Sequence, residues 1–433
     1  MTSADTVAPS RIHGTEGPFL LGCLFVVTTH FPGLGEIGGG VTLAHAIMAV
    51  GLPFWFSATV TRVALPFDRT AVRGIGVILA CVAFLIVWAF LSVIGSGTPL
   101  RSGRSLSTLV AAFAAFFLIA GTVTRRRFDM MVAILCFTLA GTCVISLAGY
   151  FEPGLRGTIY HGGDRAWGFF KNPNQFGMTI GMLLPVTAAI VLGARTRRLP
   201  WGLCLIALLI GLILSGSKMN LLIACTTLVF MVGVYPALVY RGKKRVFMVG
   251  FSLAVAGILL MANAAFLWML NPRALLLMTE FFAGDGELNT LSARSELWQL
   301  SITQFRIDPV FGQGAGHPLD PRYADSLVSH SHNVLLDYLR VMGAPGFFGM
   351  LVVILTILVL SADSVRLAFR ARWAYARDRI LCVGLATGSV SYLAANFSSD
   401  SMGPSTTPVF WTVVFLGLAA RGGLAPRRNE TTG

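Results

Sequence analysis

The sequence contains little charge. Asp, Glu, Lys and Arg make up only 12% of its 433 residues, whereas 55% are hydrophobic. A soluble protein of this length carries about twice that share of charge. The apolar residues also fall in long uninterrupted blocks instead of amphipathic stripes, a pattern typical of membrane-spanning helices. The composition therefore predicts an all-α polytopic membrane protein in which residues 1–433 form a single transmembrane domain.

Cysteine is missing from every predicted loop. All seven cysteines lie inside predicted spans, so the sequence indicates neither a disulfide framework nor a thiolate metal site. The first apolar stretch, residues 18–31, follows a polar leader and lacks a clear small-residue cleavage site. We therefore expect no cleavable signal peptide.

The interiors of the predicted spans contain no Asp, Glu, Lys or Arg. Proton- and ion-coupled transporters usually need such groups at mid-membrane. This absence disfavours a transporter or a flippase for lipid-linked saccharides, which stays the alternative function. The twelve or so expected spans are residues 18–32, 41–60, 74–94, 106–124, 130–150, 174–194, 199–215, 219–240, 246–270, 344–361, 380–397 and 405–420.

The basic residues cluster between the hydrophobic blocks. The net charge of +14 therefore reflects membrane topology, and we expect no nucleic-acid partner. With a cytoplasmic N-terminus, the inside segments hold 22 of the 33 Lys and Arg residues, almost all in short loops. The positive-inside rule then favours two cytoplasmic termini. The large loop 271–331, expected to contain short helices, and the loop 151–173 become extracytoplasmic.

The most informative stretch for chemistry is residues 323–346, where a polar loop runs directly into an apolar helix. The pattern predicts a helix from His332 to Met342, capped by Ser329 or Ser331 and broken or redirected by the glycines and proline that follow. A histidine in a first helical turn has a lowered pKa, so its neutral imidazole suits a general base. A loop histidine bonded to a neighbour is the other interpretation. Asp337 and Arg340 are spaced to form an ion pair.

A divalent metal is a second interpretation of the same loop. His330 and His332 form an H-x-H pair, and His317 or Asp325 would complete the ligand set. Such a pair is a weak signal without a defined third ligand.

Arg294 is the main candidate for binding an anion. Residues 291–307 read as one amphipathic helix, with Ser292 as its cap and Trp298, Ile302 and Phe305 on one face. Arg294 then lies in the first turn, beside exposed backbone N–H groups that suit a diphosphate, although a surface arginine is usually only solvated. The nearby Gly312–Gly316 run is either a phosphate cradle or, as we favour, a tight turn.

Two further stretches carry positive charge on the predicted outer side. Residues 165–176 contain Arg165 and Lys171, and Asn172 and Asn174 flank a proline where they can cap the sixth span. Lys218 lies on the tight turn 214–220 between the seventh and eighth spans. Its ammonium either extends to a lipid headgroup or holds the phosphates of a bound lipid.

At these residues the sequence resembles the bacterial O-antigen ligase and O-antigen polymerase family of membrane glycosyltransferases. The best match is His332-Asn333 followed, nine residues later, by Gly343-x-x-Gly346, which is similar to the histidine signature of the ligases. The stretches 165–174, 214–220 and 291–316 support it, and the resemblance covers residues 150–360.

The resemblance implies a metal-independent, inverting glycosyltransferase without a cofactor, at the outer face of the bacterial inner membrane. The donor would be a glycan on undecaprenyl diphosphate, transferred to a glycan, lipid or protein hydroxyl in lipopolysaccharide or cell-surface polysaccharide biosynthesis. His332 would be the catalytic residue, and basic residues would stabilise the diphosphate leaving group. Lys218 stands where many members carry arginine, and lysine lacks the bidentate fork. The expected substrate-binding residues are Arg294, Lys218, Arg165, Lys171, Asn174 and His330.

Overall fold

The structure is a computed structural model of the whole chain. It describes residues 14–31, 36–38, 41–62, 64–93, 99–161, 165–170, 172–194, 198–254, 257, 287–319, 330–372, 374–397 and 406–424. Most of these residues are helical, as the sequence predicts. The helices named here are α1 (Glu16–Thr29), α2 (Leu43–Val60), α3 (Arg69–Val93), α4 (Pro99–Thr122), α5 (Arg125–Phe151), α6 (Pro153–Ile159), α7 (Pro173–Gly193), α8 (Arg198–Leu214), α9 (Lys218–Val239), α12 (Glu287–Ile307), α13 (Val334–Arg370), α14 (Ala376–Asn396) and α15 (Thr407–Gly422).

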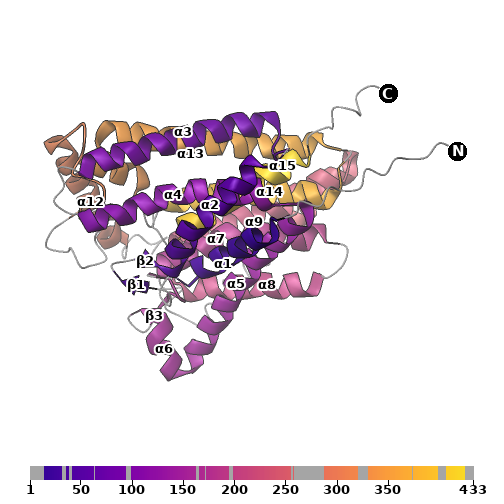
Figure 1. Cartoon of the computed structure of the whole chain (residues 1–433). Coiled ribbons are helices and arrows are strands. Elements are labelled where there is room, and N and C mark those ends of the chain that lie inside the picture. The colour runs from indigo at the N-terminus through magenta and orange to yellow at the C-terminus, as the bar shows by residue number, and fades with distance from the viewer. Residues whose placement is uncertain are drawn as a thin grey trace.

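The helices pack into one bundle, with α3 and α13 side by side along its upper edge in Figure 1. Within the described residues, six helices are long and apolar enough to cross a membrane, and four shorter helices are also apolar. The prediction of an all-α polytopic membrane protein is therefore confirmed. The first and seventh predicted spans correspond to α1 and α8, which have only 14 and 17 residues. Of the predicted span 246–270, only residues 246–254 and 257 lie within the described part.

Four short strands are a feature that the sequence analysis did not predict. Strand β1 (Glu36–Gly38) pairs antiparallel with β2 (Val41–Thr42), and β3 (Tyr160–His161) pairs antiparallel with β4 (Arg165–Ala166). Both two-stranded sheets lie at the end of the bundle where α12 is found (Figure 1). They lie in the connections between α1 and α2 and between α6 and α7.

The core of the bundle is the contact between α7 and α14, the most extensive in the fold. Nearly every residue of both helices is buried. The α14 glycines Gly384 and Gly388 permit this approach, because an added Cβ would lie 2.8 Å from the Pro185 carbonyl oxygen and 2.4 Å from that of Met182. Small residues four apart are a common device for close helix packing in membranes. Because other helices surround α14, it does not need the high hydropathy of a lipid-facing span.

The predicted end of the span 344–361 was wrong. Helix α13 continues nine residues past the expected end at 361, so Asp363 and Arg366 lie on the helix. Arg421 at the end of α15 donates to the Asp363 carboxylate at 2.7 Å, and also to Asp68. Asp363, one of the charged residues that seemed to end the span, is thus paired with another helix.

The Gly388 contact yields a direct test of the packing. We expect Gly388→Ala to lower the stability of the purified protein by about 1–3 kcal/mol, because a methyl group has no space against the α7 backbone. Thermal unfolding in detergent measures this change. Gly76→Ala on α3 is the matched control, since its Cβ meets nothing within 4 Å. Equal melting temperatures for the two variants would contradict the close approach of α7 and α14.

Candidate active site

Helix α13 begins at Val334, and Asn333 is its cap. The Asn333 Oδ1 atom accepts hydrogen bonds from the backbone N–H groups of Leu335 at 3.1 Å and Leu336 at 3.3 Å. The predicted serine cap was therefore wrong. His332 lies before the cap and not in the first turn, so the positive end of the helix dipole does not account for a lowered His332 pKa as predicted.

The backbone of His332 is in the left-handed region, with φ at 56°. Among the described residues it is the only non-glycine with positive φ. This conformation costs a residue with a side chain about 1–2 kcal/mol, and such strain persists only where the surroundings impose it. Its neighbour Ser331 is held on both sides, since its N–H donates to Asp337 Oδ1 at 2.9 Å and its carbonyl accepts from Trp298 Nε1 at 3.0 Å.

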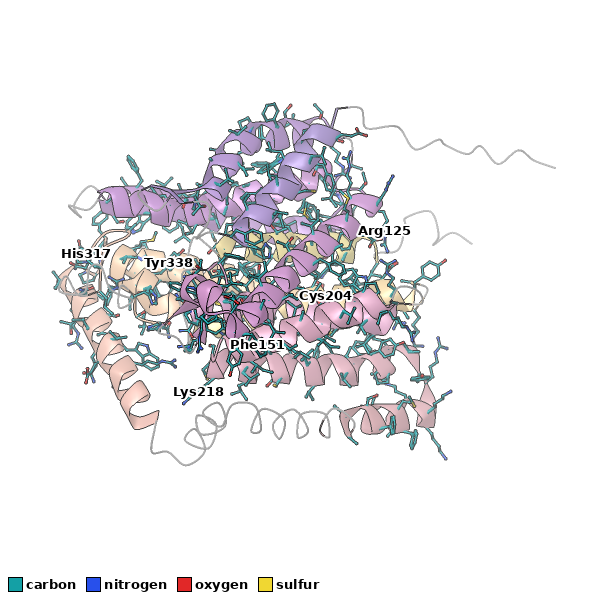
Figure 2. The ribbon with its side chains drawn as sticks, turned by 90° about the horizontal axis from the view of Figure 1, so that it is seen from below. Arg125, Phe151, Cys204, Lys218, His317 and Tyr338 are labelled. Carbon is teal, nitrogen blue, oxygen red and sulfur yellow. The ribbon has the colours of Figure 1, made fainter. Side chains whose placement is uncertain are left out.

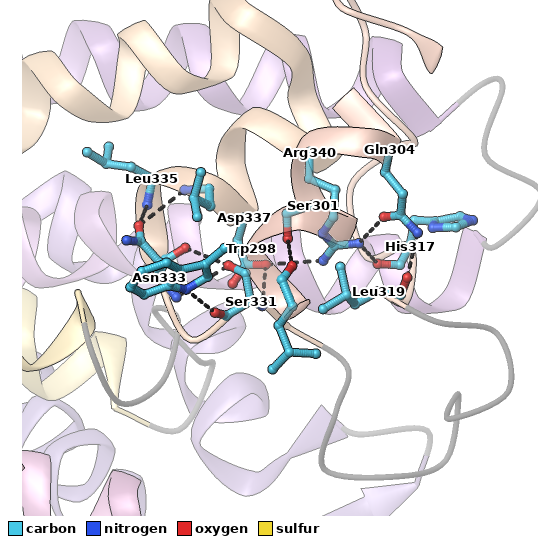
Figure 3. Close-up of polar contacts among 12 residues, drawn as sticks. Trp298, Ser301, Gln304, His317, Leu319, Ser331, Asn333, Leu335, Asp337 and Arg340 are labelled. Atoms are coloured by element: carbon cyan, nitrogen blue, oxygen red, sulfur yellow. Dashed lines mark hydrogen bonds and ion pairs between the residues drawn. The ribbon is translucent and has the colours of Figure 1, made fainter. Parts of the chain in front are cut away.

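Asp337 and Arg340 form the predicted ion pair, 3.3 Å apart and buried on both sides. Arg340 Nη1 also donates to the His317 carbonyl at 2.8 Å and to Gln304 Oε1 at 3.3 Å. Figure 3 shows these contacts as one chain of hydrogen bonds that runs from the Ser331 loop to α12. Buried polar networks make the segments they join more rigid, so this network restricts the arrangement of the loop.

The Gly312–Gly316 run is a turn, as the favoured interpretation predicted. Its backbone N–H groups are used within the protein: Gln313 donates to the Arg340 carbonyl at 2.9 Å, and Ala315 donates to Ser92 Oγ at 3.2 Å. These groups therefore attach the turn to α13 and α3 and do not form a phosphate cradle.

Helix α13 has a kink at Gly343, and the segment that leads into this turn packs against the kink. Gly343 has φ at 65° and ψ at −166°, which interrupts α13 as the sequence predicts. An added Cβ would lie 2.1 Å from the Val310 carbonyl oxygen, so only glycine fits there. Next to it, the Ala344 N–H donates to the Pro309 carbonyl at 2.9 Å. The kink docks the segment after α12 onto α13.

Arg294 lies on α12, but not at its start. The helix begins at Glu287, so Ser292 is not its cap and Arg294 is not in its first turn, contrary to the prediction. Arg294 and Trp298 are four residues apart and share a face of the helix. Because Trp298 donates to Ser331, this face meets the histidine loop. The proposed apolar face was also partly wrong, since Ile302 is 39% exposed while Ser301 and Gln304 are buried.

Arg165 and Asn174 come together at the start of α7. Arg165 Nη2 donates to Asn174 Oδ1 at 2.9 Å, and its Nε donates to the Ser215 carbonyl at 3.0 Å. Burial lowers the pKa of the Arg165 guanidinium. Asn172 is the cap of α7, since its Oδ1 accepts from the Gln175 N–H at 2.8 Å. Lys171 lies outside the described residues.

Lys218 is the first residue of α9 and is partly exposed. Within the described part of the chain it makes no hydrogen bond or ion pair, whereas the buried Asn220 donates to the Asn174 carbonyl at 2.9 Å. The turn 214–220 is therefore joined to the start of α7, with the Lys218 side chain extending outward in Figure 2.

The histidine loop and the Arg165 cluster lie at the same end of the bundle. Asn396, the last residue of α14, donates to Met178 near the start of α7, and Arg379 in the first turn of α14 donates to Ala368 near the end of α13. The starts of α7 and α13 thus share one end. Figure 2 agrees, with Lys218, His317 and Tyr338 at one end and Arg125 at the other.

The two loop histidines are close, with ring centroids 4.5 Å apart and ring planes at 81°. Among the described residues, no group of three or more His, Cys, Asp or Glu side chains is arranged to hold a metal ion. Asp325, one candidate third ligand, lies outside those residues.

A strained histidine and several basic side chains at one end of an apolar bundle define a helical membrane protein with a polar site at that end. Residues 203–351 match the family model described as O-antigen ligase, from α8 to the middle of α13. This match supports the resemblance to the O-antigen ligase family that the sequence indicated. A search of curated proteins found no match. The family match supports a glycosyltransferase-like enzyme of polysaccharide biosynthesis.

Sequence reasoning missed the residues that hold the histidine loop from α12. Trp298 was expected to pack as an apolar residue, and Gln304 was not considered. A signal was present, because Ser301 and Gln304 interrupt the apolar face of α12 at helical spacing. Polar residues at such positions indicate a buried polar partner.

The buried ion pair permits a comparison with an exposed one. We expect Arg340→Met to destabilise the protein by about 3–5 kcal/mol, because it leaves the Asp337 carboxylate buried without its cation. Arg377→Met, which breaks the half-exposed pair with Asp129, should cost less than about 1 kcal/mol. Chemical unfolding of both variants measures the difference. Similar losses in the two variants would contradict a dominant role for the buried pair.

Proposed function

We propose that the chain is an O-antigen ligase or polymerase-type glycosyltransferase with His332 as its general base. The donor is a glycan on undecaprenyl diphosphate, and the acceptor is a hydroxyl of a glycan, lipid or protein. The observation that carries the proposal is the left-handed backbone of His332 on a loop held by α12 and α13. Strain at a position that the surroundings enforce is typical of catalytic residues.

The reaction is a single displacement at the anomeric carbon. The His332 imidazole accepts the proton of the acceptor hydroxyl while its oxygen attacks that carbon. The bond from the carbon to the diphosphate oxygen breaks, and attack from the opposite side inverts the configuration. Negative charge then grows on the leaving diphosphate.

Basic residues at the same end stabilise that charge. Arg294 shares the α12 face that meets the histidine loop. Arg165 and Lys218, with Asn174, belong to the cluster around the start of α7. Fixed cations aimed at developing charge are a major source of rate enhancement. We assign Lys171 and His330 to substrate binding as well, and these cations take the part that a metal ion plays in other transferases.

The proposed catalytic region is residues 150–360, and we propose that the donor's lipid tail lies against the apolar spans. The bundle end opposite to His332 carries Arg125, Arg198 and Arg377. By the positive-inside rule that end is cytoplasmic. We therefore propose a bacterial inner-membrane protein with both termini in the cytoplasm, an extracytoplasmic active site and a large outer loop at residues 271–331.

His332→Gly separates catalysis from folding. Glycine removes the strain of the left-handed backbone, and this gain offsets its greater chain entropy in the unfolded state. We expect stability within about 1 kcal/mol of wild type, and glycan transfer at background level. The measurement is transfer from a labelled undecaprenyl-diphosphate glycan by the reconstituted protein. Transfer at the wild-type rate would overturn His332 as the base.

Arg294→Gln tests the leaving-group interaction. We expect kcat/KM to fall about 10²- to 10³-fold, because a cation beside the departing diphosphate is lost. Arg306→Gln is the matched control, since Arg306 is an exposed arginine in the last turn of the same helix. Equal activity in both variants would exclude Arg294 from the site.

Chelation tests the role assigned to these cations. With EDTA in the same reconstituted assay, we expect an unchanged transfer rate. A loss of transfer that added Mg²⁺ or Mn²⁺ restores would assign the charge stabilisation to a metal ion.

A further inference from the structure

A large cavity lies at the opposite end of the bundle from His332. Its volume is about 1480 Å³, and its walls come from the ends of α5, α7, α8, α9 and α14 that face away from the histidine loop. This volume exceeds the range of about 300–1,000 Å³ of most small-molecule sites. Figure 2 shows Arg125, one of its lining residues, far from Lys218 and Tyr338. The proposed glycosyl transfer does not use this space.

Charged residues are found at the mouth of the cavity. Among the described residues, three arginines and two aspartates line it, and together they carry one excess positive charge. Arg125 on α5 is paired with Asp378 on α14, and Arg377 on α14 is paired in return with Asp129 on α5 at 3.1 Å. The two aspartates are thus matched by cations from the facing helix.

Arg198 supplies the excess charge. Its Nε donates to the Ala194 carbonyl at the end of α7. Within the described residues, its two Nη groups have no hydrogen-bond partner and no carboxylate lies at ion-pair distance. Helix α14 also begins at this mouth, and its cap residue Tyr375 makes no side-chain cap hydrogen bond. Both features favour an anion at the mouth.

The remaining lining of the cavity is largely apolar. Met130 and Phe137 of α5, Ile190 of α7 and Trp201 of α8 line it, and the rings of Phe137 and Trp201 lie 4.7 Å apart. From Arg125 to Phe137 the lining extends over twelve residues of α5, or about 18 Å along the helix. The cavity is therefore cationic beside the first turns of α5, α8 and α14 and apolar further along α5.

We propose that this cavity binds one anionic phospholipid of the membrane leaflet at that end. The phosphate lies at Arg198 and Arg377, and an acyl chain extends along α5 toward Phe137. A bilayer supplies such a molecule at that depth, and basic pockets between membrane helices suit anionic headgroups. A bound lipid fills the space between α5 and α14, which the two ion pairs span only at the mouth. It is thus a structural ligand whose binding is independent of glycan transfer.

The experiment uses the full chain, purified and delipidated in a neutral detergent. Dioleoylphosphatidylglycerol, dioleoylphosphatidylcholine or inorganic phosphate is added, and bound lipid is counted by native mass spectrometry. We expect one phosphatidylglycerol to bind in preference to phosphatidylcholine and to raise the melting temperature. Equal binding of the two lipids would overturn the proposal. Displacement of phosphatidylglycerol by millimolar phosphate would instead identify an anion site without a lipid tail.

Two variants separate the headgroup from the acyl chain. Arg198→Gln, which keeps a donor for Ala194, should weaken phosphatidylglycerol binding about fivefold. Ala133→Trp fills the cavity from α5 and should abolish binding with every charge intact. Arg366→Gln is the control for charge, because Arg366 is exposed on α13 and does not line the cavity. Wild-type binding in Arg198→Gln, or equal weakening in Arg366→Gln, would overturn the site even if Ala133→Trp fails to fold.

Discussion

The buried ion pair between Asp337 and Arg340 is the interaction on which the site depends. Its two charges are almost fully removed from solvent, so each must be satisfied by a fixed set of neighbours. Asp337 holds the Ser331 N–H, and Arg340 holds Gln304 and the His317 carbonyl. The pair therefore connects the histidine loop to α12. Its main effect is to select one geometry, since apolar residues would pack a helix junction at lower cost.

This geometry places a strained backbone at the same end of the bundle as a partly exposed lysine. His332 is held in a left-handed conformation by contacts of its neighbour, whereas Lys218 extends from the start of α9 without a described contact. A base needs a fixed position relative to the reacting carbon, and strain absorbed by the fold supplies one. A lysine that meets a diphosphate at a membrane surface only needs reach and charge.

Much of the fold could be predicted because its cause is local. The apolar blocks predicted a span at residues 174–194, and α7 is Pro173–Gly193. The spacing of Asp337 and Arg340 predicted their ion pair, which the structure contains. The errors have distant causes. Helix α13 continues past residue 361 because Asp363 meets Arg421, far along the chain. The cap at Asn333 depends on the backbone at His332, which Trp298 helps to fix across the loop. Contacts between residues far apart in the chain cannot be predicted from the sequence around either residue.

The central claim is that the donor diphosphate lies at the bundle end that carries His332. A photoreactive undecaprenyl-diphosphate analogue, with the reactive group next to the diphosphate, tests it most directly when the crosslinked peptides are sequenced after reconstitution. The account predicts crosslinks in α12, in residues 330–333 and in the turn 214–220. Crosslinks concentrated in the first turns of α5, α8 and α14, at the other end of the bundle, would contradict it.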